Sequence, residues 1–91
     1  MAVAIHMWYV YILVSKRHSG YLYVGFTNNI DRRLTEHNAA RSELATAPYH
    51  PLKLVGYIAL CDEENARVLE QYFKSGSGKA FLKKRLLALK S

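Results

Sequence analysis

Residues 8–25, WYVYILVSKRHSGYLYVG, carry the clearest structural signal in the sequence. The first part of this stretch, Trp8 to Val14, is a run of β-branched, aromatic and aliphatic residues that is typical of a strand. A polar segment that ends at Gly20 is typical of a turn, and residues 21–25 again favour a short strand. The stretch therefore predicts a β-hairpin with a loop of about six residues.

Side chains along a strand point to alternate faces, so the order of residue types predicts what each face of this hairpin does. One face is aliphatic apart from a tryptophan, and it comprises Trp8, Val10, Ile12, Val14, Leu22 and Val24. The other face carries the tyrosines Tyr9, Tyr11, Tyr21 and Tyr23. The aliphatic face is predicted to be core, and the tyrosine face is either a second packed layer or a polar-tipped working surface.

Capping residues indicate where the later elements begin. Thr27, Asn28 and Asn29 are N-cap candidates for a helix that we expect to end near residues 41–45. Residues 52–60 then favour a third strand.

Two more helices are predicted towards the end of the chain. Asp62 suits the N-cap of the first, Gly76 is a natural stop for it, and Ser77 is a natural cap for the second. The order strand, strand, helix, strand, helix, helix predicts an α+β domain with a three-stranded, mainly antiparallel sheet flanked by helices.

The length of 91 residues leaves room for one domain, which we expect to span residues 7–91. Residues 1–6 are interpreted as the remnant of an expression tag, because His6-Met7 is typical of a cloning junction. No apolar run of about 18 residues is present, so no membrane contact through a spanning helix is expected. The one cysteine, Cys61, has no internal partner, which favours a cytoplasmic setting.

The formal net charge of +6 favours a polyanionic partner, and nucleic acid is the commonest one. Basic side chains of this kind contact phosphates and give affinity without a choice of sequence. The residues predicted to do so are Lys53, Lys74, Lys79, Lys83, Lys84 and Arg85.

Two helices carry residues that suggest chemistry. Glu70 borders the apolar side of its helix, where it either pairs with Arg67 or Lys74 or acts as a metal ligand, since Mg²⁺ is often bound by one or two protein carboxylates. Arg33 and His37 lie four residues apart and share a helix face, which is either a solvated basic face or a phosphate clamp.

Taken together, these positions resemble the GIY-YIG nuclease family. Residues 9–11, Tyr-Val-Tyr, stand where the family has Gly-Ile-Tyr, and residues 23–25, Tyr-Val-Gly, stand where it has Tyr-Ile-Gly. Arg33 follows the second motif's tyrosine by ten residues, as the family's functional arginine does, and His37 matches a histidine or tyrosine found four later. Residues 66–70, Ala-Arg-Val-Leu-Glu, resemble the segment with the metal-binding glutamate.

The resemblance implies a metal-dependent endonuclease that hydrolyses DNA phosphodiester bonds, with selectivity for DNA structure and a link to repair or recombination. The implied catalytic residues are Tyr11, Tyr23, Arg33, His37 and Glu70. Glu70 would hold Mg²⁺ or Mn²⁺, and Arg33 would grip the phosphate. Tyr23 is the first choice of general base, with His37 as its rival, and Tyr11 would orient Tyr23 or the water.

The resemblance is strongest to small, stand-alone bacterial members, so we expect a monomer in the bacterial cytoplasm near the nucleoid, with a protein partner as one source of specificity. Two alternatives stay open from the residues themselves. One is a basic nucleic-acid-binding module without catalysis, and the other is an interaction domain that binds an acidic protein through its last helix.

Overall fold

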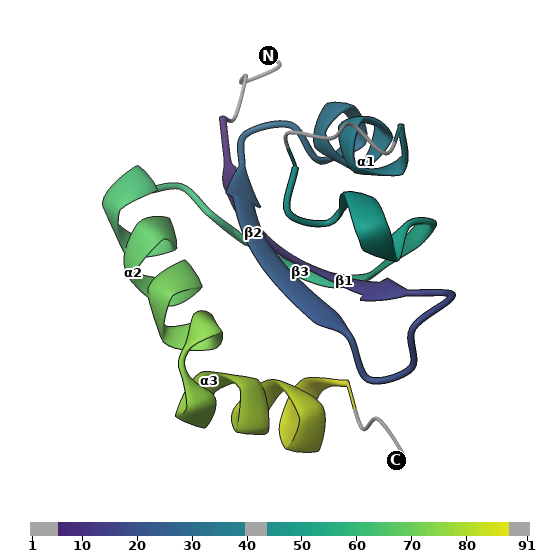
Figure 1. Ribbon diagram of the computed structural model, residues 1–91. Coiled ribbons are helices and arrows are strands. Elements are labelled where there is room, and N and C mark those ends of the chain that lie inside the picture. The colour runs from purple at the N-terminus through teal and green to yellow at the C-terminus, as the bar shows by residue number, and fades with distance from the viewer. Residues whose placement is uncertain (1–5, 40–43, 88–91) are drawn as a thin grey trace.

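The computed structural model describes residues 6–39 and 44–87 and confirms the α+β fold (Figure 1). One antiparallel sheet has the order β2-β1-β3. Its strands are β1 (Trp8–Ser15), β2 (Leu22–Thr27) and β3 (Leu52–Leu60). The helices are α1 (Ile30–Asn38), α2 (Glu63–Lys74) and α3 (Gly76–Phe81), with a 3₁₀ turn η1 (Ala47–Tyr49) and a π-type turn η2 (Leu82–Leu86).

The sheet separates two layers of helices. In Figure 1, α2 and α3 lie on one side of the strands, while α1 and η1 lie on the other. The predicted aliphatic face is core on the α2 side, where Val10, Ile12 and Val24 pack against Phe73 and Leu82. This confirms the division of faces that the alternation in the hairpin predicts.

The tyrosine face is also packed, because Tyr11 and Leu13 are buried there against Leu52 and partly cover Leu34 of α1. The sequence allows this face to be either a second packed layer or a polar-tipped working surface, and the structure combines the two. Tyrosine rings form a layer, and some of their hydroxyl groups reach polar partners.

The hairpin loop has the predicted length of about six residues, but at residues 16–21 it begins and ends one residue later than predicted. Two predicted helix starts are confirmed by local hydrogen bonds. The Asn29 side chain accepts from the Arg32 N–H and caps α1, and the Asp62 side chain accepts from the Asn65 N–H and caps α2. Each cap satisfies a helix N–H that has no partner within the helix.

Two predicted boundaries are wrong. Helix α1 ends at Asn38, before residues 41–45 (of which 41–43 lie outside the described part), because the Asn38 side chain instead bonds both the N–H and C=O of Leu52. Ser75 replaces Gly76 and Ser77 as the break between α2 and α3: its N–H donates to the Tyr72 carbonyl, and its hydroxyl accepts from the Gly78 N–H.

No helix in the described part of the chain is long and apolar enough to cross a membrane. Residues 1–5 lie outside that part, so the interpretation of residues 1–6 as a tag remnant stays a prediction.

Candidate active site

The candidate residues gather beside β2, which is an edge strand of the sheet. Tyr11 and Tyr23 project from the tyrosine face, and the Tyr11 and Tyr23 ring centroids are 6.3 Å apart. His37 on α1 lies against both, at 5.9 Å from the Tyr11 ring and 5.1 Å from the Tyr23 ring. Two strands and one helix therefore bring three predicted residues into one aromatic cluster.

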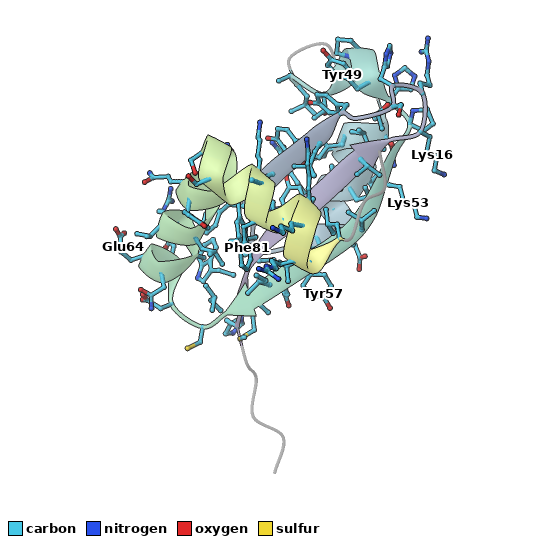
Figure 2. All side chains as sticks on the ribbon, turned by 90° about the horizontal axis from the view of Figure 1, so that it is seen from below. Lys16, Tyr49, Lys53, Tyr57, Glu64 and Phe81 are labelled. Atoms are coloured by element: carbon cyan, nitrogen blue, oxygen red, sulfur yellow. The ribbon has the colours of Figure 1, made fainter. Side chains whose placement is uncertain are left out.

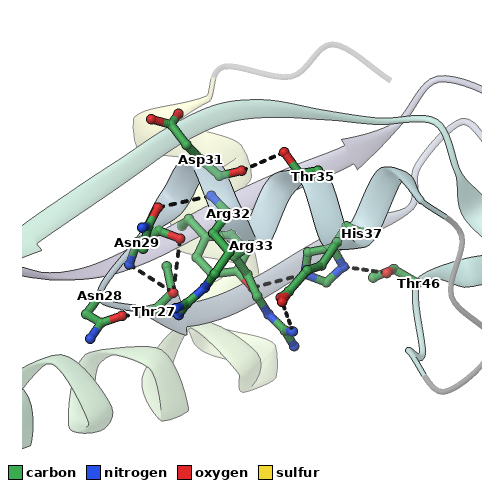
Figure 3. A network of polar contacts seen from close by, with 11 residues as sticks. Thr27, Asn28, Asn29, Asp31, Arg32, Arg33, Thr35, His37 and Thr46 are labelled. Carbon is green, nitrogen blue, oxygen red and sulfur yellow. Dashed lines mark hydrogen bonds and ion pairs between the residues drawn. The ribbon is translucent and has the colours of Figure 1, made fainter.

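A chain of hydrogen bonds runs through this cluster (Figure 3). The Tyr11 hydroxyl lies 3.0 Å from His37 Nε2, and His37 Nδ1 lies 2.5 Å from the Thr46 hydroxyl. Tyr11, His37 and Thr46 are 2%, 1% and 0% exposed. Both ring nitrogens of His37 thus have partners, so its ring is fixed in orientation and has no nitrogen directed at solvent.

Burial sets the protonation states of these groups. Desolvation raises the pKa of Tyr11 to about 12, although its hydrogen bond with the Arg33 side chain acts in the opposite direction. Desolvation also lowers the pKa of His37, and the nearby Arg33 charge adds to that effect. At neutral pH the pair is therefore a phenol hydrogen-bonded to a neutral imidazole.

Arg33 is held at the mouth of this cluster. Its Nη1 forms an ion pair of 2.9 Å with the Glu36 carboxylate, one turn along α1, and its side chain is 32% exposed. The bond to Glu36, together with the interaction with Tyr11, raises the pKa of Arg33. A permanently charged guanidinium, partly open to solvent, is thus fixed beside the tyrosine layer.

Gly25 explains why the second motif ends in glycine. It pairs with Tyr11 across β1 and β2, and the Tyr11 phenol ring lies directly over its Cα. A Cβ at this position would overlap the ring, so a larger residue would displace Tyr11 from His37.

Glu70 approaches the cluster from the other side of the sheet. It lies on α2, its carboxylate pairs with Lys74 Nζ at 3.2 Å, and its side chain is 20% exposed. Lys74 Nζ also lies 5.9 Å from the centre of the Tyr23 ring. The negative charge of Glu70 raises the pKa of Tyr11, whereas the positive charge of Arg33 lowers it. The five predicted catalytic residues are therefore all found around the edge of β2.

The pair with Lys74 is one of the two structural roles that the sequence allows for Glu70. The other candidate partner, Arg67, pairs instead with Glu63 at 2.8 Å and lies over the Phe26 ring. A structural role for Glu70 is thus present, and it does not exclude a second role.

The donor set at Glu70 fits one kind of metal ion. In residues 6–39 and 44–87, no three His, Cys, Asp or Glu side chains gather into a metal site. An ion at Glu70 would rest on this carboxylate, on water and on substrate oxygens. Mg²⁺ is often bound in this way, whereas zinc sites need three or four protein ligands.

The six predicted DNA-binding residues do not form one group. Lys74 lies beside Glu70 and Tyr23. Lys53 lies on β3 at the hairpin end of the sheet, opposite Val14 of β1. The remaining four are exposed on α3 and η2, namely Lys79, Lys83, Lys84 and Arg85.

Two residues of the polar network are absent from the sequence-based prediction. Glu36 holds Arg33, and its position one turn after Arg33 was a usable signal for an i, i+3 ion pair. Thr46 holds His37 across a loop, and no local pattern marks it. Its contact depends on how the chain folds back after α1.

Comparison with known proteins gives the same assignment as the geometry. A family model described as the GIY-YIG catalytic domain matches residues 7–85. A UPF0213 protein of Lactiplantibacillus plantarum is 37% identical over 82 residues, which cover 88% of this chain and 79% of that protein. A UPF0213 protein of Bacillus licheniformis is 37% identical over 71 residues, covering 78% and 71%. No solved structure matches significantly.

The fold and the match to a nuclease domain define the class of this protein as that of small nuclease domains. More particularly, the chain belongs to the GIY-YIG family, whose nucleases generally depend on a divalent metal, and its relatives are bacterial.

Proposed function

We propose that this chain is an endonuclease that uses a divalent metal to hydrolyse DNA phosphodiester bonds at the edge of β2. The observation that carries the proposal is the placement of opposite charges beside the tyrosine layer. Arg33 of α1 is fixed by Glu36 and stays partly exposed, and Glu70 of α2 pairs with Lys74, whose Nζ lies 5.9 Å from the Tyr23 ring. A carboxylate for a cation and a guanidinium for a phosphate are the two electrostatic groups that phosphoryl transfer needs.

Glu70 would hold Mg²⁺ or Mn²⁺, which when bound acts as a Lewis acid on a phosphate oxygen and the leaving 3′ oxygen. Arg33 binds the same phosphate, because its forked donors match phosphate oxygens and Glu36 keeps the side chain in place. Water attacks phosphorus in line, the bond to the 3′ oxygen breaks, and the product carries a 5′-phosphate.

Tyr23 is the general base in this proposal. Within residues 6–39 and 44–87, no hydrogen bond engages its hydroxyl group, and its side chain is half-buried. His37 is less suitable, because Thr46 and Tyr11 occupy both of its ring nitrogens. Lys74 Nζ lies 5.9 Å from the centre of the Tyr23 ring, so a cation stands beside this side chain.

Tyr11 is a positioning residue in this scheme. With a pKa of about 12 it stays a phenol at neutral pH. It joins His37 to Arg33 and keeps the guanidinium directed at the phosphate. A monomer in the bacterial cytoplasm, acting in DNA repair or recombination, is the setting we propose for the activity.

A second candidate function is a basic nucleic-acid-binding module without catalysis. The ion pair between Glu70 and Lys74 favours it, because that pair accounts for a half-buried carboxylate without any metal. The two functions predict different products from the same incubation.

The separating experiment incubates the protein with labelled linear, nicked, flapped and branched DNA. Each DNA is tested with Mg²⁺, with Mn²⁺ and with a chelator. The proposal predicts cleavage of at least one DNA with either metal, no cleavage with the chelator, and products that a ligase can rejoin through their 5′-phosphates. Binding without cleavage on every DNA would establish the binding module instead.

A further inference from the structure

The hairpin loop that joins β1 to β2 carries three basic side chains in succession, Lys16, Arg17 and His18, and all of them are exposed. None belongs to the site described above. The loop lies at the end of β2 that is near Tyr21 and Tyr23. At the rise of a β-strand, it is about 10 Å from Tyr23. The loop is therefore a basic surface on the same strand as the candidate active site.

The backbone of this loop is anchored by hydrogen bonds to Ser15 and to residues 49–51. The Ser15 hydroxyl donates to the Tyr49 carbonyl at 2.6 Å and accepts from the N–H groups of Arg17 and His18 at 3.1 and 2.9 Å. The Lys16 N–H donates to the Pro51 carbonyl at 2.9 Å. One serine thus fixes the two residues that follow Lys16 and ties the turn to η1.

Aromatic rings support the same turn from the tyrosine face. Tyr21 stacks on Tyr49 with centroids 3.8 Å apart and planes within 7°, and His18 packs edge-on against Tyr49 at 5.2 Å. Gly20, with a φ of 87°, supplies the left-handed residue that closes the turn. The basic side chains project from a frame that is fixed before any ligand binds.

Charge is distributed unevenly along the sheet, which indicates what binds the turn. Residues Asp62, Glu63 and Glu64 lie beyond the far end of the sheet, where Trp8 pairs with Leu60. Figure 2 shows Lys16 and Lys53 together on one side of the view and Glu64 on the opposite side. The hairpin end is thus the basic end of the sheet, and its ligand carries negative charge.

We propose that this anchored turn is a second contact for the DNA backbone. In it, Lys16 and Arg17 bind phosphates of the strand that leaves the active site along β2. A single DNA strand advances about 3.4 Å per nucleotide along the helix axis, so the turn lies roughly three nucleotides from the scissile phosphate. This inference rests on the proposed function for its ligand, and it assigns a binding role to residues outside the catalytic group.

A pre-fixed turn loses less conformational entropy on binding than flexible lysine-rich loops do. Affinity should therefore depend on two separable properties, the charge of Lys16 and Arg17 and the anchor at Ser15. Each property has its own variant, and the two variants have different signatures.

The charge is tested by the double variant Lys16→Gln/Arg17→Gln. Binding to a fluorescent DNA duplex is measured by anisotropy in EDTA, so that no cleavage occurs, across about 50–200 mM salt. Each lost phosphate contact lowers the slope of log K against log salt by about 0.9, so we expect a reduction approaching 2. The control, Arg32→Gln/Arg67→Gln, changes the net charge equally at the other end of the sheet and should leave the slope nearly unchanged.

The anchor is tested by Ser15→Ala, which keeps every charge but removes three hydrogen bonds. We expect weaker binding with the wild-type salt slope. A thermal melt of each variant establishes that the domain is folded at the temperature of the assay. Should Ser15→Ala destabilise the domain, the double variant still decides the question, because Lys16 and Arg17 are exposed and their side chains make no ion pair or hydrogen bond within residues 6–39 and 44–87.

The proposal is overturned if the double variant and its control change the slope equally, if neither changes it, or if the wild-type protein has no affinity for DNA near 100 mM salt. Its failure is distinguishable from failure of the nuclease proposal. If the wild-type protein cleaves DNA but the double variant leaves the salt slope unchanged, only the turn site is refuted. If the double variant lowers the salt slope but the wild-type protein cleaves no DNA, only the nuclease proposal is refuted.

Discussion

The two faces of the sheet differ in what their buried side chains can do. The face covered by α2 and α3 is built from aliphatic and aromatic side chains, with Phe73 and Leu82 at its centre. The face covered by α1 buries hydroxyl and imidazole groups instead, including His37 and Thr46. The first contributes stability, while the second gives up some apolar burial to hold polar groups in defined positions.

The candidate site uses both faces, because β2 is an edge strand. Glu70 and Lys74 come from the helix on the stabilising face, and Lys74 lies over the ring of Tyr23, which comes from the other face, beside that edge. An edge strand allows this meeting, since no further strand separates the two layers there. If the two faces have these different roles, variants on each face should have different effects.

The largest expected effect is on stability and concerns Phe73, which is 2% exposed in the aliphatic core. Phe73→Ala should lower the free energy of unfolding by about 3–5 kcal/mol, because it removes a ring and leaves a cavity. Urea denaturation measures the change. A loss below about 1 kcal/mol would mean that the α2 face is not the main source of stability.

Tyr23→Phe should lower activity but leave stability nearly unchanged. Because the Tyr23 hydroxyl makes no hydrogen bond in the described part of the chain, the free energy of unfolding should change by less than about 0.5 kcal/mol. Cleavage should fall by about 100-fold or more, the range typical of a lost general base. Full activity in this variant, measured in single-turnover assays, would eliminate Tyr23 as the base.

Thr46→Val tests the least obvious residue of the network. It keeps the shape of the side chain but removes the hydroxyl that bonds His37 Nδ1. A net loss of about 1–1.5 kcal/mol for one hydrogen bond corresponds to roughly tenfold slower cleavage. Nitrogen chemical shifts of the imidazole should show a changed tautomer ratio, and Thr46→Ser should restore both. An unchanged imidazole spectrum in Thr46→Val would remove its positioning role.

The smallest effect is the pH dependence that His37 confers. Its pKa is lowered in the folded state, so the unfolded chain takes up the proton first as pH falls. Stability from this group is complete above the unfolded pKa of about 6.5 and is lost as pH falls towards the folded pKa, with a slope of at most about 1.4 kcal/mol per pH unit. An NMR titration should place the His37 pKa below the unfolded value of about 6.5, and a value above it would contradict the account.

Local signals in the sequence were sufficient for much of the fold. The alternation in residues 8–25 gave both faces of the hairpin, and Asn29 and Asp62 marked helix starts because a cap acts within one turn. The end of α1 was not predictable, because it is marked by Asn38, whose side chain bonds the Leu52 backbone across the fold. Ser75 was not predicted as the cap because Gly76 and Ser77, which follow it directly, are equally plausible boundary residues.

The site divides in the same way. Arg33, His37 and Glu70 were predicted because helical spacing and the family resemblance agree on them. The bond from Thr46 to His37 depends on a long-range contact that no spacing encodes. The relation of Tyr11 to Gly25 follows from strand register, which the hairpin turn sets but single-residue patterns do not reveal.

The central claim is that Glu70 serves chemistry in addition to its ion pair. The most direct test compares Glu70→Gln with Glu64→Gln, an exposed residue on the same helix, at saturating DNA and Mg²⁺ or Mn²⁺. The account predicts that Glu70→Gln loses at least about 100-fold in cleavage rate while it still binds DNA, and that Glu64→Gln cleaves like the wild-type protein. Equal cleavage rates for the two variants would contradict it.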